Sequence, residues 1–222
     1  MKKVAKALSL ALAVGCVASM AACGGSDLAL GKELLIRDTQ LDALMSVDKG
    51  EADAAVIDSV MAGYYATKGD LKGKIKVVEG LVLAEEEYGI AAKKENQAFM
   101  SKINEALIAL AGNGGLTSVA SEFGLQNDFA VTATTENPYA NATDSSWETI
   151  KTEGTIVIGY TVFAPIAYEE TPGTLTGFDV ELAKDVVEYL NSTYTLSLEL
   201  EFQIIDWNSK ETLLENGTID LV

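Results

Sequence analysis

The sequence predicts an α/β fold, and three observations support this prediction. Short apolar runs rich in β-branched residues alternate with longer amphipathic stretches from Leu28 to Leu125, and the alternation resumes at Thr155. Hydrophobic residues make up 48% of the chain and charged residues 22%, which is typical of globular proteins. The length of 222 residues suits one large or two small domains with a sizeable core.

The amphipathic stretches between residues 32 and 125 predict four helices. In helix 38–48, Leu41, Leu44 and Met45 share one face, and helix 96–111 repeats apolar residues at helical spacing. The other two helices are expected at 59–68 and 117–123. Three short apolar runs predict buried strands at 52–57, 74–78 and 88–92.

A polar stretch divides the chain at residues 126–148. It is rich in Thr, Asn, Ala, Ser and Asp and has almost no apolar periodicity, which predicts a linker. After it, the alternation predicts strand 155–160, a loop up to Gly177, helix 179–190, strand 197–205, helix 209–215 and strand 219–222.

The first 22 residues have the composition of a bacterial export signal. Three lysines precede an apolar run that ends at Val17, which is too short to span a membrane. The Met-Ala-Ala-Cys tetrad that ends at Cys23 resembles a lipobox. We therefore expect a lipoprotein signal peptide at 1–22, lipidation of Cys23 and a tether at 23–31. An ordinary signal peptide cleaved after Ala22 is the alternative.

The charge and the absence of histidine exclude several classes of function. The formal net charge is -17, so a nucleic-acid backbone would be repelled. Histidine, the commonest general base and metal ligand, does not occur in the chain. We therefore expect no enzyme activity, no catalytic residue, and no bound metal or cofactor.

The run from Gly177 to Ala183, Gly-Phe-Asp-Val-Glu-Leu-Ala, is the most distinctive motif. Gly177 permits a tight turn, and Asp179 can cap the helix that follows. With the aromatic loop 163–168 before it and Asp206-Trp207 after it, this run resembles the start of the polar amino-acid solute-binding proteins of ABC importers, which are periplasmic binding proteins of type 2, family 3.

The region upstream of the linker resembles the end of the same family. The similarity covers residues 50–58, residues 87–91 and the helices that end at Gly124. The resemblance therefore implies the family's halves in permuted order, with the middle segment missing. The expected fold is periplasmic-binding-protein-like, type 2, with one nearly complete lobe and a partial second lobe. Its parts are 32–84 as partial lobe two, 85–125 as the C-terminal part of lobe one, and 149–222 as its N-terminal part.

The resemblance also implies four ligand contacts. Phe163 lies where the family stacks an aromatic ring on the ligand, and Trp207 matches a second aromatic wall. Tyr160 occupies a specificity position, and Asp58 aligns with the acid that pairs with the ligand's α-ammonium. The alternatives are that Asp58 only caps helix 59–68 and that the aromatic residues only pack.

The α-carboxylate clamp of the family is an arginine in the segment that would follow residue 222. The only arginine in this chain is Arg37, at no matching position. We therefore expect the chain alone to bind amino acids weakly or not at all.

The resemblance implies a membrane-anchored, extracytoplasmic lipoprotein, on the periplasmic or cell-surface face, that captures a small polar amino acid for an ABC transporter permease. A rearranged or truncated fragment with little or no ligand binding is the alternative. A catalytic relative on the same scaffold is disfavoured by the lack of histidine, and pairing between chains at exposed strand edges is a further hypothesis.

Overall fold

The computed structural model describes residues 33–126 and 130–222. The chain divides into two compact units, the first ending at Ala55 and the second running from Val56 to Val222. The predicted signal peptide, the tether and Cys23 lie outside the described residues. Among the described residues, no helix has both the length and the apolar composition needed to cross a membrane.

The described part of the first unit contains one helix, α2 (Gln40–Asp48). Thr39 caps it, because the Thr39 hydroxyl accepts a hydrogen bond from the backbone N–H of Asp42 at 3.0 Å. Arg37 donates from Nε to Ser46 Oγ at 2.7 Å, and its Nη2 lies 3.0 Å from Glu51 Oε2. The only arginine of the chain is therefore engaged within this unit.

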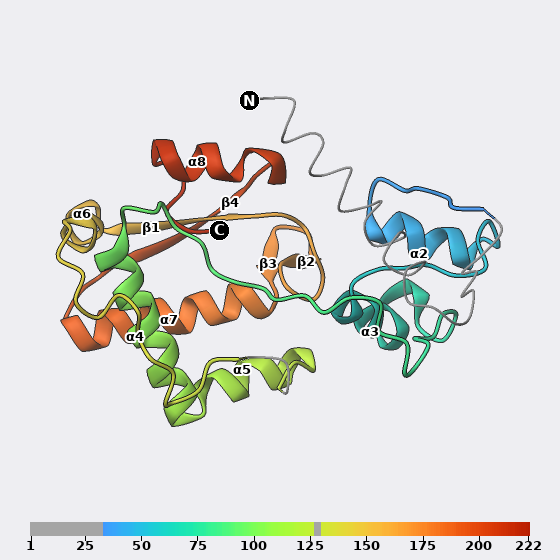
Figure 1. The fold of residues 1–222 in the computed structure, drawn as a ribbon, viewed down its shortest axis with the longest axis horizontal. Helices are drawn as coiled ribbons and strands as arrows, with labels where there is room; N and C mark the ends of the chain where they lie inside the picture. The colour runs from blue at the N-terminus through green and yellow to red at the C-terminus, as the bar shows by residue number, and fades with distance from the viewer. Residues whose placement is uncertain (1–32, 127–129) are drawn as a thin grey trace, which may run out of the picture. The chain divides into compact units, whose positions relative to one another are not determined.

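The core of the second unit is formed by four helices and strand β1 (Figure 1). Helix α4 (Gln97–Asn113) packs against α5 (Gly115–Phe123), α6 (Ser146–Glu153) and α7 (Phe178–Tyr194). Phe99 on α4 and Leu190 on α7 are both 0% exposed. Because α4 precedes the polar stretch 126–148 and α7 follows it, the two sides of that stretch share one hydrophobic core.

The main sheet is small and parallel. Strand β1 (Thr155–Tyr160) pairs with β4 (Glu199–Ile204), with Thr155 opposite Glu199 and Tyr160 opposite Ile204. On the other side of β1, Ile158 forms a parallel bridge with Leu221, and Leu221 forms an antiparallel bridge with Ala92. Ala92, upstream of the polar stretch, therefore joins the sheet built by the end of the chain.

The remaining elements of the second unit are short. Helix α3 (Ser59–Thr67) and the 3-10 turn η1 (Gly69–Leu71) precede α4. Strands β2 (Tyr168–Thr171) and β3 (Thr174–Thr176) form an antiparallel hairpin. The 3-10 turn η2 (Trp207–Ser209) leads into helix α8 (Lys210–Asn216).

The polar stretch supplies the caps for the start of α4. Asn96, at the N-cap position of α4, makes no side-chain cap hydrogen bond. Instead, Asp144 Oδ2 accepts from the backbone N–H of Ala98 at 2.8 Å, and Ser146 Oγ accepts from that of Phe99 at 2.9 Å. These two bonds satisfy N–H groups that the first turn of a helix leaves without an intrahelical partner.

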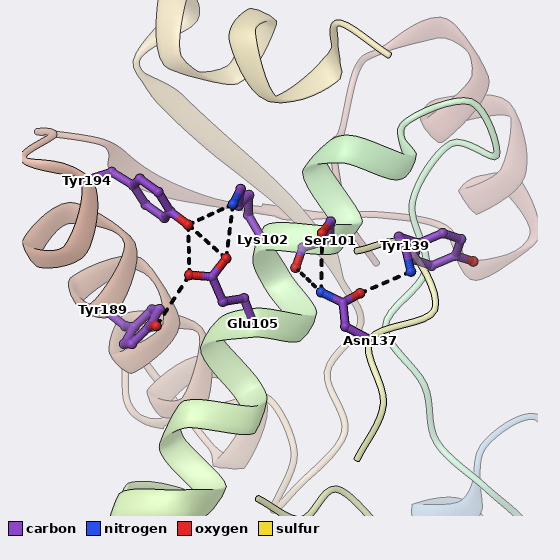
Figure 2. Close-up of polar contacts among 7 residues, drawn as sticks. All are labelled: Ser101, Lys102, Glu105, Asn137, Tyr139, Tyr189 and Tyr194. Atoms are coloured by element: carbon purple, nitrogen blue, oxygen red, sulfur yellow. Dashed lines mark hydrogen bonds and ion pairs between the residues drawn. The ribbon is translucent and has the colours of Figure 1, made fainter. Parts of the chain in front are cut away.

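Figure 2 shows two further polar contacts of α4. Asn137 donates from Nδ2 to the Ser101 carbonyl at 2.9 Å, which ties the polar stretch to the helix. On α7, the Tyr194 hydroxyl lies 2.7 Å from Lys102 Nζ and donates to the Glu105 carboxylate at 2.7 Å. Burial alone would raise the pKa of Glu105, but hydrogen bonds from Tyr194 and Lys102 outweigh it and hold that pKa below its ordinary value.

The structure differs from the sequence prediction in its strands and in two further elements. Residues 52–57 and 74–78 form no strand, and in the predicted strands 88–92 and 219–222 only Ala92 and Leu221 make bridges. No described segment pairs with the first two, and Val56 and Val78 are exposed, so their apolar side chains are not covered by a sheet. Helix α6, which begins inside the predicted linker, and the β2–β3 hairpin were not predicted.

Candidate ligand-binding site

Phe163 lies in a tight loop that packs against the start of α7. Its backbone N–H donates to the Ala167 carbonyl at 2.7 Å, and the N–H of Asp179 donates to the Ile166 carbonyl at 3.0 Å. Gly177 has a φ of 130°, and a Cβ at this position would collide with the Ile166 carbonyl. Gly177 therefore allows the close approach that holds Phe163 next to the first turn of α7.

Tyr88 connects Asp58 with Phe163. The Tyr88 hydroxyl donates to Asp58 Oδ2 at 2.9 Å. The ring centroids of Tyr88 and Phe163 lie 6.4 Å apart, with the ring planes tilted by 41°. Two of the four predicted ligand residues, Asp58 and Phe163, are thus linked through a tyrosine that the prediction did not include.

Asp58 also caps helix α3. Its Oδ1 accepts hydrogen bonds from the backbone N–H groups of Val60 at 2.9 Å and Met61 at 3.0 Å. The capping role, which the sequence left open as the alternative, is confirmed. Ligand contact by Asp58 stays a prediction.

Asp179 does not have the capping role that the sequence suggested. Gly177 occupies the N-cap position of α7, and Asp179 lies within the first turn. Its side chain is exposed to solvent, although the protein atoms around the carboxyl group desolvate it and raise its pKa to about 6.

Asp58, Tyr88, Phe163 and Asp179 together form what we call the acidic–aromatic cluster. Burial, the hydrogen bond to Asp58, and the negative charges of Asp58, Glu86 and Asp179 all raise the pKa of Tyr88. The electrostatic environment of the Tyr88 hydroxyl is therefore negative. Sequence spacing alone gave no sign that the charge of Asp179 acts on Tyr88, because the two residues are far apart in the chain.

The two other predicted ligand residues have different neighbours. The Tyr160 ring lies edge-on to Phe202, with centroids 6.4 Å apart. Trp207 is 52% exposed, and Lys210 Nζ lies 4.7 Å from its ring centroid. Among the ring contacts of the described residues, none joins Tyr160 or Trp207 to the acidic–aromatic cluster. Their ligand roles stay predictions.

A surface depression of the second unit lies away from this cluster. It has a volume of about 330 Å³ and is formed by the start of α4, by α6 and by the α8 region, with Lys93, Asp144 and Asp220 in its lining. None of the four predicted ligand residues lines it. The described residues also contain no group of three or more Cys, Asp or Glu side chains suited to hold a metal ion.

The C-terminal third of the chain is similar in sequence to a known protein family. Residues 156–222 match the bacterial extracellular solute-binding proteins, family 3. The matched stretch includes Tyr160, Phe163, Asp179 and Trp207, but not Asp58 or Tyr88. This part of the chain is therefore similar to a family of extracellular solute-binding proteins, which are normally not enzymes. Neither the curated proteins nor the solved structures gave a match.

Proposed function

We propose that this protein is the solute-binding lipoprotein of an ABC importer, which captures a small polar amino acid outside the cytoplasm and passes it to the permease. The observation that carries this proposal is the match of residues 156–222 to the family 3 solute-binding proteins. In this proposal the lipid on Cys23 anchors the protein to the membrane, and the protein needs neither a cofactor nor catalytic residues.

The acidic–aromatic cluster supports a ligand that carries an ammonium group. The carboxylates of Asp58 and Asp179 supply negative charge, and a carboxylate forms strong charge-assisted hydrogen bonds with an ammonium. The Phe163 ring, carried by the loop that hydrogen-bonds to the start of α7, offers a surface on which an apolar or cationic part of the ligand can stack. Tyr160 and Trp207 would contribute further contacts when the protein closes around the ligand.

The packing of the second unit supports a permuted arrangement of the family's halves. Helix α4, upstream of the polar stretch, packs on α7, and Ala92 bridges to Leu221. We propose that residues 85–125 and 149–222 build lobe one together, and that residues 32–84 belong to lobe two. Closure of two lobes would bind the ligand through contacts made only in the closed state.

A second candidate function is that of a rearranged binding-protein fragment with little or no affinity for amino acids. The observation that favours it is the position of Arg37, which pairs with Glu51 and Ser46 and so does not serve as a carboxylate clamp. A ligand carboxylate that is buried without a partner loses on the order of 3 to 5 kcal/mol, which lowers affinity several hundredfold or more.

Thermal melting of the purified protein with each of the common amino acids separates the two candidates. One ligand that raises the melting temperature in a concentration-dependent manner supports amino-acid capture, since a ligand that binds only the folded state stabilises it. Phe163→Ala should remove that shift, whereas Val162→Ala, at an exposed position beside it, should not. A cooperative transition that no amino acid moves would instead support the fragment.

A further inference from the structure

The stretch between α3 and α4 leaves an apolar run exposed to solvent. Residues 76–90 belong to no helix or strand, and every one of them is exposed. Val78 is 62% exposed and Val82 is 75% exposed. Among the described residues, none makes a backbone hydrogen bond to residues 82–87. The run therefore presents both apolar side chains and the backbone groups that a neighbouring strand would bind.

The composition of this run favours a β-strand once a second strand lies beside it. Valine is enriched in strands, because its branched side chain packs well on a pleated sheet. The chain turns at residues 79–80, where Gly80 has a φ of 75°. Since glycine adopts positive and negative φ about equally readily, this turn can straighten at little cost when a neighbouring strand supplies hydrogen bonds.

The charges of this segment are separated along its length. Three lysines precede the apolar run and three glutamates follow it, and Glu79 is the only charged residue from 77 to 84. The six flanking residues are Lys72, Lys74, Lys76, Glu85, Glu86 and Glu87. Two identical copies that lie antiparallel would bring the basic end of each beside the acidic end of the other, whereas a parallel alignment would place like charges together.

An antiparallel alignment centred on Gly80 pairs the two copies in charge and in polarity. It sets Val78 opposite Val82 of the second copy, in the middle of the apolar run. On the same face, it makes Lys76 a diagonal neighbour of Glu86 of the second copy, which is within reach of a long side chain. Because the pair has two-fold symmetry, each of these contacts occurs twice.

We propose that residues 74–87 form a contact between two copies of this chain, which pair as antiparallel β-strands about Gly80. The net charge of -17 makes two copies repel one another, so association depends on the local attraction where lysines meet glutamates. This inference goes beyond the proposed function, and its test does not depend on whether the protein captures a solute.

The first measurement is the mass of the protein as a function of its concentration. Sedimentation equilibrium of the purified full chain is run from about 1 to about 200 µM, a range suited to a weak interface of this small size. We expect the average mass to rise from that of one chain toward that of two. The mass of one chain at every concentration would overturn the inference.

Charge reversal then locates the contact. Lys76→Glu and Glu86→Lys each place like charges beside one another at both ends of the pair, so each variant alone should associate about tenfold more weakly than wild type. Lys94→Glu is the matched control, because it makes the same change in charge at an exposed residue outside the segment. It should change the association by less than about threefold. Equal weakening by Lys76→Glu and Lys94→Glu, or no weakening by Lys76→Glu, would overturn the inference.

A mixture of the two reversed variants gives the sharpest test. In a pair formed by one Lys76→Glu chain and one Glu86→Lys chain, both contacts again join a lysine to a glutamate. An equimolar mixture should therefore associate about as tightly as wild type, although neither variant does so alone. A mixture that associates no better than its components would overturn the inference. Thermal melting of each variant by itself checks that it folds.

Discussion

Asp144→Ala tests whether the polar stretch holds the start of α4 in place. In the wild type, Asp144 Oδ2 accepts from the Ala98 N–H at 2.8 Å, and Oδ1 accepts from the Ser146 N–H at 3.0 Å. The Asp144 side chain therefore caps the N-terminus of α4, although α4 begins far upstream of Asp144 in the sequence. Loss of an N-cap costs about 1 kcal/mol, and loss of a negative charge at a helix N-terminus adds up to about 1 kcal/mol.

We therefore expect Asp144→Ala to lower the free energy of unfolding by about 2 kcal/mol. For a chain of this size, each kcal/mol corresponds to about 2 to 4 °C, so the melting temperature should fall by about 4 to 8 °C. The assay is urea denaturation followed by circular dichroism, with thermal melting as a second measure. Glu136→Ala, an exposed acid in the same stretch, should change the free energy of unfolding by less than about 0.5 kcal/mol.

The pH dependence gives this prediction a second test. Burial alone would raise the pKa of Asp144, but hydrogen bonds from Ser146 and from the Ala98 N–H outweigh it and hold the pKa below its ordinary value. Such a group stabilises the fold above its unfolded pKa and loses that effect as the pH falls through its folded pKa. The difference between wild type and Asp144→Ala should therefore shrink in acid below about pH 4. A variant as stable as wild type at pH 7 would refute the capping argument.

Three further substitutions have defined expected outcomes. Phe99→Ala removes a side chain that is 0% exposed in the core, so the free energy of unfolding should fall by about 3 to 5 kcal/mol in urea denaturation. Asp179→Asn should stabilise the protein at pH 7, because burial raises the pKa of Asp179 to about 6 and its ionisation costs stability as the pH rises from about 4 to about 6. Since solvent reaches this side chain, we expect a gain of only about 1 kcal/mol, measured by melting at pH 4 and pH 7, and no gain at pH 7 would contradict the assignment. Tyr194→Phe removes a hydrogen bond of 2.7 Å to Glu105 and should cost about 1 to 2 kcal/mol, whereas Tyr189→Phe, whose bond to Glu105 is 3.5 Å long, should cost less in the same denaturation assay.

The helices were predictable from sequence where apolar residues repeat over several turns. Helix α4 was expected at 96–111 and lies at Gln97–Asn113, and α7 was expected at 179–190 and lies at Phe178–Tyr194. Strand β1 has the predicted bounds. Helix α6 was missed because it is short and polar, with only Trp147 and Ile150 buried.

The missing strands have a different cause. Residues 52–57 and 74–78 have the composition of buried strands, but a strand forms only where a neighbouring strand supplies its hydrogen bonds. Whether a neighbouring strand is present depends on residues far away in the sequence, so local composition cannot predict it.

The candidate site was only partly predictable for the same reason. Phe163 and Asp58 were identified through a family resemblance, and each lies in a loop next to a helix start. Tyr88 and Asp179 lie in runs that also resemble the family, but no ligand role was expected for them, since their place beside the Phe163 loop depends on the tertiary fold.

The shared core of α4 and α7 has a consequence for how the chain could be divided. Residues 132–136 of the polar stretch are exposed, while the segments on either side of them contribute side chains to the same core. A chain cut at this point would give two fragments, each with an apolar surface that only the other fragment covers. Their assembly would depend on concentration, whereas the intact stretch makes the same association intramolecular. The polar stretch thus sets the effective concentration at which the two parts of one core meet.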